Sequence, residues 1–401
     1  MGVIKACLVP KGGYRLQGGR MRNPGLGVCE GAEEERDMTR GAEHYACLAN
    51  TFLLIAVMLP TVAAGAAQEG NAPLLLKTSE IEVGVLPQVG GRIVQLRKPG
   101  RPNVLLSDPA LWQEPEEAIP TPETLNQERY FFKAYNGHIL WVGPQSEWYN
   151  QQTFYPGKKG DIWPPDPFLT WGRYTVLEKT ERRLVLQSPE SPVSGVVFTK
   201  TIDIAPTGEV RVKNTARNIR QAPVSWDLWS NTRVSPFASV YVPLRGRIRI
   251  ETETGENFER QPLQYELVDG FFIIANHRRP LATPFTSTGG KAFLDVRAGF
   301  IAAFDNGMCL IKRFPVVEDA RLSKGQSNVE VYYNLDASKA DSNEIELENH
   351  GPFQTLPPGG TMEMNESLTV AEYTGEPTPA AHIAFLNALG LGSEPAAPAK
   401  P

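Results

Sequence analysis

The stretch that decides the fold is "NEIELENHGPFQTLPPGGTMEMNESLTV", residues 343–370. In its first part Glu346 and Glu348 alternate with Ile345 and Leu347. Strict alternation is typical of a half-buried β-strand, because successive side chains point to opposite faces of a sheet. The two glutamates therefore share one face, and "GPFQTLPPGG" is the turn-forming connection to a final strand.

The preceding run, "SNVEVYYNLD", alternates in the same way and places Glu330, Tyr332 and Asn334 on one face. Because "LDASKADSNE" is short, we expect the two strands to be antiparallel neighbours with their polar faces side by side. Carboxylates gathered in this way raise the pKa of at least one of them. A cation from "MCLIKRF", Lys312 or Arg313, would neutralise the group. The alternative is an ordinary solvated outer face.

Short β-type runs recur from Leu74 to Val370 between Gly- and Pro-rich turns, which predicts an all-β sandwich in one domain, residues 72–374. The segment 107–176 is rich in Pro, Gly and Trp and has almost no helical period, so we expect long ordered loops there. Residues 375–401 are predicted to form a flexible tail with a short helix near His382 to Leu389.

The N-terminal region carries the features of a secretory signal. "CLANTFLLIAVML", residues 47–59, is an apolar run of about 13 residues, too short to span a membrane, and Ala64 and Ala66 form an A-x-A cleavage motif. We expect a signal peptide at 38–67 and therefore an exported protein, periplasmic or secreted, with no membrane span in the mature chain. Residues 1–37 show no hydrophobic periodicity, so we expect them to be unstructured. Our hypothesis is that translation begins at Met38, and the alternative is Met1.

Charge and motifs exclude several classes of function. A net charge of -5 and a pI near 5.7 give no basic patch for nucleic acid. No Gly-rich phosphate loop, no G-x-S-x-G elbow and no H-x-x-H or H-E-x-x-H spacing occurs, so we expect neither a cofactor nor a metal. Only Cys309 follows the predicted cleavage site, which leaves no internal disulfide in the mature chain.

Aromatic residues suggest a ligand. Trp141 lies in the loop-rich segment, and Trp226 and Trp229 lie in "SWDLWSNTRV". Tryptophan rings beside Glu, Asn and Arg suit the apolar faces and the hydroxyl groups of pyranose sugars. The alternative is that each tryptophan fills the core.

The order of the segments resembles the galactose-mutarotase-like superfamily. The resemblance is carried, in order, by "VLPQVGGRIVQLRKPGRPNVLL", "NGHILWVGPQ" with "WPPDP", "EVRVKNTARNIRQAPVSWDLWSNTRV" and "IELENHGPFQTLPPGGTMEMNESLTV", and it covers residues 74–372. Within that superfamily the segments are similar to those of an uncharacterised exported bacterial family. The resemblance implies a β-supersandwich whose concave face binds carbohydrate.

In mutarotases of the superfamily a glutamate on a late strand acts as base and a histidine on a central strand as acid. Glu348 best matches the glutamate, with Glu346 as the alternative register. The central strand has Trp226 to Trp229 and no histidine, so His138 or His350 would have to replace it.

The missing histidine favours a sugar-binding or sugar-processing accessory protein. The alternatives are an aldose 1-epimerase that uses Glu348 as base, and a non-catalytic interaction module of the envelope. The sugar, any turnover and the oligomeric state stay open. The candidate residues form two groups: Glu348, Glu346 and His138 for catalysis, and Trp141, Trp226, Trp229, Arg233, Lys312, Glu330, Tyr332 and His350 for saccharide binding.

Overall fold

The computed structural model describes residues 72–113, 121, 135–253, 261–275, 287–336 and 343–392. All of them belong to a compact unit that spans residues 66–401. The predicted signal peptide at 38–67 and the segment 1–37 lie outside the described residues. No described helix is long and apolar enough to cross a membrane.

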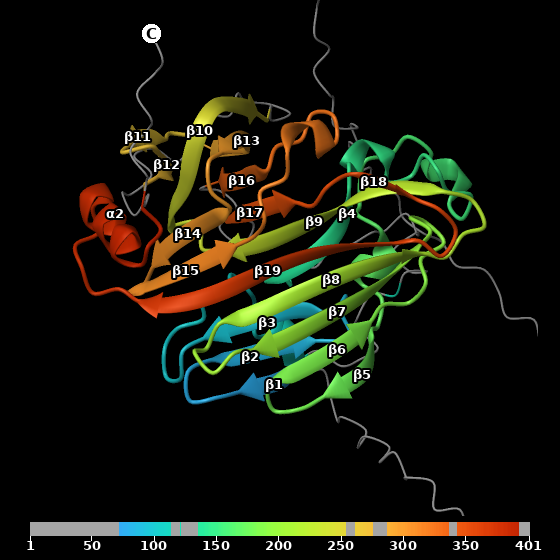
Figure 1. The fold of residues 1–401 in the computed structure, drawn as a ribbon, viewed down its shortest axis with the longest axis horizontal. Helices are drawn as coiled ribbons and strands as arrows, with labels where there is room; N and C mark the ends of the chain where they lie inside the picture. Colours follow the sequence, from blue (N-terminus) through green and yellow to red (C-terminus); the bar gives the residue numbers. More distant parts are fainter. Residues whose placement is uncertain are drawn as a thin grey trace, which may run out of the picture. The chain divides into compact units, whose positions relative to one another are not determined.

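The described chain is built of antiparallel β-strands in two packed sheets, as predicted (Figure 1). The first sheet, in spatial order, consists of β1 (Leu74–Lys77), β2 (Glu82–Leu86), β3 (Arg92–Arg97), β4 (His138–Gly143), β9 (Val224–Val234), β17 (Glu344–His350), β16 (Val329–Asp336), β13 (Ser287–Val296) and β10 (Ser239–Thr252). A short strand, β18 (Gln354–Leu356), pairs with the start of β9.

The second sheet, again in spatial order, consists of β5 (Thr175–Lys179), β6 (Arg183–Gln187), β7 (Val196–Ile204), β8 (Val210–Asn218), β19 (Thr361–Glu372), β15 (Met308–Arg313), β14 (Phe300–Asp305), β10, β12 (Phe271–Ile274) and β11 (Glu266–Val268). The long strand β10 belongs to both sheets: its first part pairs with β12 and β14, and its second part with β13. A register shift between Leu244 and Ile248 interrupts the pairing of the second part with β13.

The core lies between the sheets and follows from the alternation in the sequence. Ile345 and Leu347 of β17 are fully buried in one cluster with Val212 of β8 and Leu310 of β15. Because β17 points these apolar residues inward, Glu346 and Glu348 point to the opposite face of the first sheet. Burying such side chains supplies most of the driving force for folding.

Helices are few. Beside α1 (Pro167–Thr170), the described chain has the 3-10 turns η1 (Leu111–Gln113), η4 (Gln145–Glu147), η5 (Pro156–Lys158) and η6 (Asp319–Arg321), and a C-terminal helix, α2 (Pro379–Ala388). Apart from β4, α1, these turns and the start of β5 at Thr175, the described residues of the predicted loop segment 107–176 are irregular.

Helix α2 packs against the second sheet, whereas the sequence indicated a flexible tail with a short helix. Thr378 caps its first turn by accepting a hydrogen bond from the Ala381 amide, and Pro379 suits the first helical position. The ring of His382 stacks on Phe304 at 4.0 Å between centroids, and its Nδ1 lies 2.7 Å from the hydroxyl of Tyr241. These contacts make residues 379–388 part of the folded unit.

Candidate functional site

The register of β17 with its neighbours brings the predicted carboxylates together. Glu346 pairs with Arg233 of β9 and with Tyr332 of β16, and Glu348 pairs with Asn231 and with Glu330. Paired residues on adjacent strands point to the same side of a sheet. We call this side the carboxylate face and define it by the side chains of Trp141, Asp227, Trp229, Asn231, Arg233, Lys291, Glu330, Tyr332, Glu344, Glu346, Glu348 and His350.

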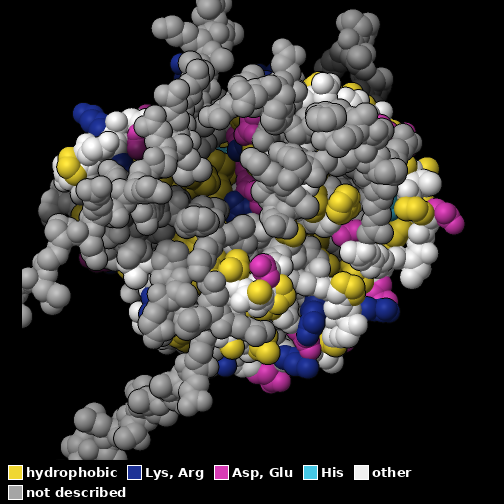
Figure 2. All heavy atoms as spheres, turned by 180° about the vertical axis from the view of Figure 1, so that it is seen from behind, with side chains coloured by type: hydrophobic (Ala, Val, Ile, Leu, Met, Phe, Trp, Pro, Cys, Tyr) yellow, Lys and Arg dark blue, Asp and Glu magenta, His cyan; other side chains and the backbone are white. Residues whose placement is uncertain are grey.

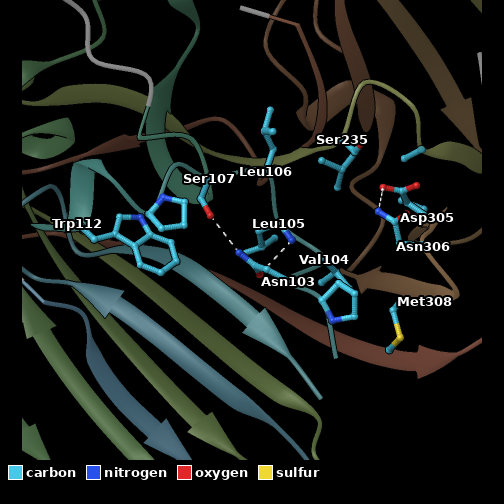
Figure 3. A pocket seen from close by; sticks show the side chains of 15 residues that line it. Asn103, Val104, Leu105, Leu106, Ser107, Trp112, Ser235, Asp305, Asn306 and Met308 are labelled. Carbon is cyan, nitrogen blue, oxygen red and sulfur yellow. Dashed lines mark hydrogen bonds between the residues drawn. The ribbon is translucent and has the colours of Figure 1, made fainter. Parts of the chain in front are cut away.

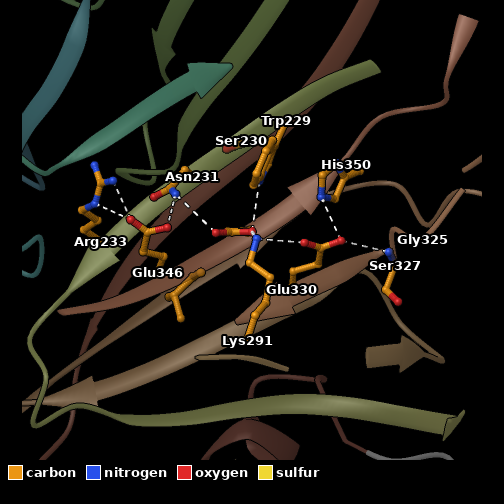
Figure 4. A network of polar contacts seen from close by, with 12 residues as sticks. Trp229, Ser230, Asn231, Arg233, Lys291, Gly325, Ser327, Glu330, Glu346 and His350 are labelled. Atoms are coloured by element: carbon orange, nitrogen blue, oxygen red, sulfur yellow. Dashed lines mark hydrogen bonds and ion pairs between the residues drawn. The ribbon is translucent and has the colours of Figure 1, made fainter. Parts of the chain in front are cut away.

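Lys291 lies at the centre of this face. Its Nζ donates to Oε2 of Glu348 at 2.6 Å and to Oε2 of Glu330 at 2.9 Å (Figure 4). The ammonium also lies 4.5 Å from the centre of the Trp229 ring, whose Nε1 donates to Glu348 at 3.1 Å. Glu330 and Glu348 are buried, whereas the Lys291 side chain is 18% exposed, so the face reaches solvent at Lys291.

His350 sits between two carboxylates. Its Nδ1 lies 3.1 Å from Oδ1 of Asp227, and its Nε2 lies 3.4 Å from Oε1 of Glu330. Burial by itself would lower the pKa of His350, but the negative charges of Glu330 and Asp227 outweigh it and raise the pKa to about 9. The imidazole is therefore positively charged at neutral pH.

Arg233 holds the other end of the face. Its Nε donates to Oε1 of Glu346 at 2.7 Å and lies 3.0 Å from Oε2 of Glu344. The guanidinium lies 5.6 Å from the centre of the Trp141 ring. Arg233 is buried, so these contacts offset the free-energy cost of removing its charge from water. They also hold Glu346 in one orientation.

Opposite charges alternate across the face with one break, between Glu348 and Glu346. Along the network the order is Asp227, His350, Glu330, Lys291, Glu348, Glu346, Arg233 and Glu344. At the break the amide Nδ2 of Asn231 donates to Glu346 at 2.7 Å and to Oε1 of Glu348 at 3.5 Å (Figure 4).

The break changes the acidity of Glu348. Burial, together with the negative charges of Glu346 and Glu330, outweighs Lys291 and raises the pKa of Glu348 to about 8. Burial would also raise the pKa of Glu346, but Arg233 reverses this and lowers it. Of the two neighbours, Glu348 is therefore the one that holds a proton.

Three predicted site residues do not join this face. His138 pairs with Thr232 and Trp226 lies one residue before Asp227, so the parity of their strands turns both toward the interior. Nδ1 of His138 lies 2.9 Å from the Thr232 hydroxyl, and Trp226 Nε1 donates to the carbonyl of Ser194. Lys312 of β15 lies between the sheets and donates to the Leu347 carbonyl at 3.0 Å.

Glu366 of β19 is the centre of this interior polar group, and sequence reasoning missed it. It accepts from Ser230 Oγ at 2.8 Å and lies 3.3 Å from His138 Nε2 and 3.7 Å from Lys312 Nζ. The signal was available: in "TMEMNESLTV" Glu366 occupies the same parity as the apolar Met364. A charged residue at a core position needs buried partners.

Lys291, Asn231, Asp227 and Glu344 were also missed on the carboxylate face. Asn231 and Asp227 share the parity of Arg233 along β9, which would have identified them. Lys291 gave a weaker signal, because Gly289 and Gly290 interrupt the strand pattern just before it.

Glu330, Glu348 and His350 also have the geometry of a metal-binding group, since one ligand atom of each lies within 4.8 Å of the others. Lys291 already supplies a positive charge against both carboxylates of this group. The two carboxylates of the group are therefore already paired with a cation, and His350 contacts Glu330 and Asp227.

Two cavities lie elsewhere among the described residues. One, of 290 Å³, is lined by the loop after β3 and by the β14–β15 turn (Figure 3). Its Asn103 already donates to the carbonyl of Val94 and to Ser107. The second, of 500 Å³, lies along β8 and β15. In Figure 2, acidic and basic side chains lie next to one another near the middle of the side turned toward the viewer.

Comparison with known proteins places the chain in a family. Residues 72–371 match the family described as "Domain of unknown function (DUF4380)". The chain belongs to this family. No curated protein matches the sequence.

Solved structures similar to this DUF4380 protein carry the predicted resemblance. They include a proposed aldose 1-epimerase from Escherichia coli K12 (12% identity, TM-score 0.47, 75% of this chain and 99% of that one), a galactose mutarotase-like protein from Clostridium acetobutylicum (11%, 0.44, 74% and 94%) and a galactose mutarotase related enzyme from Lactobacillus acidophilus (10%, 0.45, 76% and 99%). The resemblance to galactose-mutarotase-like proteins is confirmed. At these identities it concerns the fold and identifies no site residue or activity in this chain.

Proposed function

We propose that this protein binds a saccharide on the carboxylate face. The observation that carries the proposal is a set of three buried polar atoms that make no hydrogen bond: Nε1 of Trp141, Oδ1 of Asn231 and Nη1 of Arg233. Leaving a buried polar atom unpaired costs about 1–3 kcal/mol, so three on one face indicate a missing partner.

The mixture of these atoms favours hydroxyl groups as that partner. Nε1 of Trp141 and Nη1 of Arg233 are donors, whereas Oδ1 of Asn231 is an acceptor. A simple anion or cation would satisfy only one kind, but a hydroxyl group both donates and accepts. Indole rings beside these groups suit the apolar face of a pyranose ring.

Titration calorimetry with a panel of mono- and disaccharides tests this proposal. We expect binding that Asn231→Ala weakens and that Glu363→Gln, a change at an exposed site on β19, leaves unaltered. The proposal is wrong if the panel and a broad glycan array both show no binding, a result that would favour an interaction module of the envelope.

We further propose that the protein acts after export, with residues 38–67 as its signal peptide. N-terminal sequencing of the secreted or periplasmic form would test this.

A second candidate function is aldose 1-epimerisation. The observation that favours it is the placement of His350, rather than His138, on the same face as Glu348. In that reaction the ionised form of Glu348, which prevails above its pKa of about 8, would take the proton of the anomeric hydroxyl, and a positively charged His350 would donate to the ring oxygen. Exchange NMR with common aldoses separates the two candidates: an epimerase accelerates anomer interconversion and loses this in Glu348→Gln, whereas a binding protein does not accelerate it.

A further inference from the structure

The carboxylate face holds five acidic and three basic side chains. The acidic ones are Asp227, Glu330, Glu344, Glu346 and Glu348, of which Glu348 holds a proton, and the basic ones are Arg233, Lys291 and a protonated His350. Each of the three cations is already engaged: Lys291 with Glu330 and Glu348, His350 between Asp227 and Glu330, and Arg233 with Glu346 and Glu344. Within the described part of the face, a ligand's anionic group would therefore find every cation already paired with a carboxylate.

No cation lies between Glu348 and Glu346, at the break. Nδ2 of Asn231 donates to Oε2 of Glu346 at 2.7 Å and, over a long 3.5 Å, to Oε1 of Glu348, and the protonated carboxyl of Glu348 donates a hydrogen bond to Glu346. Oδ1 of Asn231 is fully buried and makes no hydrogen bond. The break thus brings acceptor oxygens of three side chains together, and one proton stands there where the rest of the network has a cation.

An ammonium group matches this arrangement. It offers three N–H donors and a positive charge, and it has no acceptor that would be left unpaired. Indole rings line the surroundings, since Trp229 donates to Glu348 and packs edge-on against Trp141 at 5.0 Å between centroids. Aromatic faces attract cations as well as sugar rings.

We propose that the saccharide bound on this face is an amino sugar whose ammonium group lies between Glu346 and Glu348. This inference rests on the proposed function and specifies its ligand class. It predicts discrimination by charge: amino sugars bind most tightly, neutral sugars of the same ring less tightly, and uronic acids least.

Calorimetry with D-glucosamine, N-acetyl-D-glucosamine, D-glucose and D-glucuronate tests the inference. At about pH 6.5, below the usual pKa of such amines, we expect glucosamine to bind about ten- to a hundredfold more tightly than glucose. N-acetylation removes the charge but keeps the substituent, so it should abolish the gain. Glucose or glucuronate binding as tightly as glucosamine would overturn the inference and leave saccharide binding intact, whereas no binding by any sugar would overturn both.

Two further measurements locate the ammonium. Glu346→Gln should reduce the preference for glucosamine over glucose about tenfold, and Glu363→Gln, the same change at an exposed position, should not. In the unmodified protein, glucosamine should displace the proton held by Glu348, so its binding enthalpy should differ between phosphate and Tris buffers while that of glucose does not. An unchanged preference in Glu346→Gln, or equal enthalpies for glucosamine in both buffers, would contradict the assignment.

Discussion

The ammonium of Lys291 lies 2.6 Å from the carboxylate of Glu348, in the middle of a sheet face on which five acidic side chains meet. Lys291 and Glu348 come from strands that are not adjacent, because β16 lies between β13 and β17. The lysine side chain therefore crosses one strand, and in doing so it ties Glu330 and Glu348 together.

Replacing Lys291 by Met should lower the free energy of unfolding by about 3 kcal/mol, because it leaves buried carboxylates without their cation. Urea denaturation at neutral pH measures the change. Lys213→Met removes a cation from an exposed pair with Glu363 and should change the stability by less than about 0.5 kcal/mol. The double variant Lys291→Met/Glu348→Gln should regain part of the loss, and a double variant less stable than the single one would contradict the assigned pairing.

Replacing Trp229 by Phe should weaken saccharide binding about tenfold, because Glu348 loses the indole donor at 3.1 Å while an aromatic ring is kept. Trp226→Phe is the matched control: it makes the same change on the same strand, but its side chain points into the core. We expect it to lower stability without changing affinity. Equal losses of affinity in both variants would show that the carboxylate face is not the binding surface.

Stability should depend on pH through Glu366. Burial alone would raise its pKa, but His138 and Lys312 lower it from 4.5 to about 2. A carboxyl group with a depressed pKa stabilises the folded state above the unfolded pKa, and this contribution is lost as the pH falls from about 4.5 to about 2. Over that range we expect the unmodified protein to lose about 3 kcal/mol through this group. Thermal unfolding of Glu366→Gln as a function of pH should lack this part of the acid transition, and parallel curves for the two proteins would exclude the role.

Gly90→Ala should be strongly destabilising. Gly90 has φ +68°, and a Cβ there would lie 2.2 Å from the carbonyl oxygen of Thr170. Gly100 has almost the same φ, +71°, but open space around it. We expect Gly100→Ala to lower the free energy of unfolding by about 1 kcal/mol, because alanine is strained at a positive φ. Gly90→Ala adds the clash with Thr170 and should lower it by at least about 2 kcal/mol more. Chemical denaturation of both variants measures the difference, and equal losses would show that the contact with Thr170 is relaxed.

Alternation in the sequence was sufficient to predict most of the fold and about half of the site. The two neighbouring strands β16 and β17 pair in a register that places Glu330 opposite Glu348 and Tyr332 opposite Glu346, so all four side chains share one face. Parity within one strand also separates Trp226 from Trp229, so a stricter use of the rule would have removed Trp226 from the candidate site.

Residues that depend on which strands become neighbours could not be predicted in this way. His138 begins β4, and nothing in "NGHILWVGPQ" reveals whether its odd or even positions face the core. Lys291 reaches Glu348 only because β13 lies two strands away from β17, a non-local pairing that a single sequence does not specify.

Lys312, which lies between the sheets, has a consequence for evolution and engineering. Its ammonium donates to the main-chain carbonyl of Leu347, the residue that separates Glu346 from Glu348 on β17. This hydrogen bond therefore reaches the main chain between the two glutamates from the interior side of the sheet, opposite the carboxylate face. Mutant libraries designed to alter ligand preference should therefore include core positions. Substitutions at these buried positions can move the binding groups on the carboxylate face without replacing them.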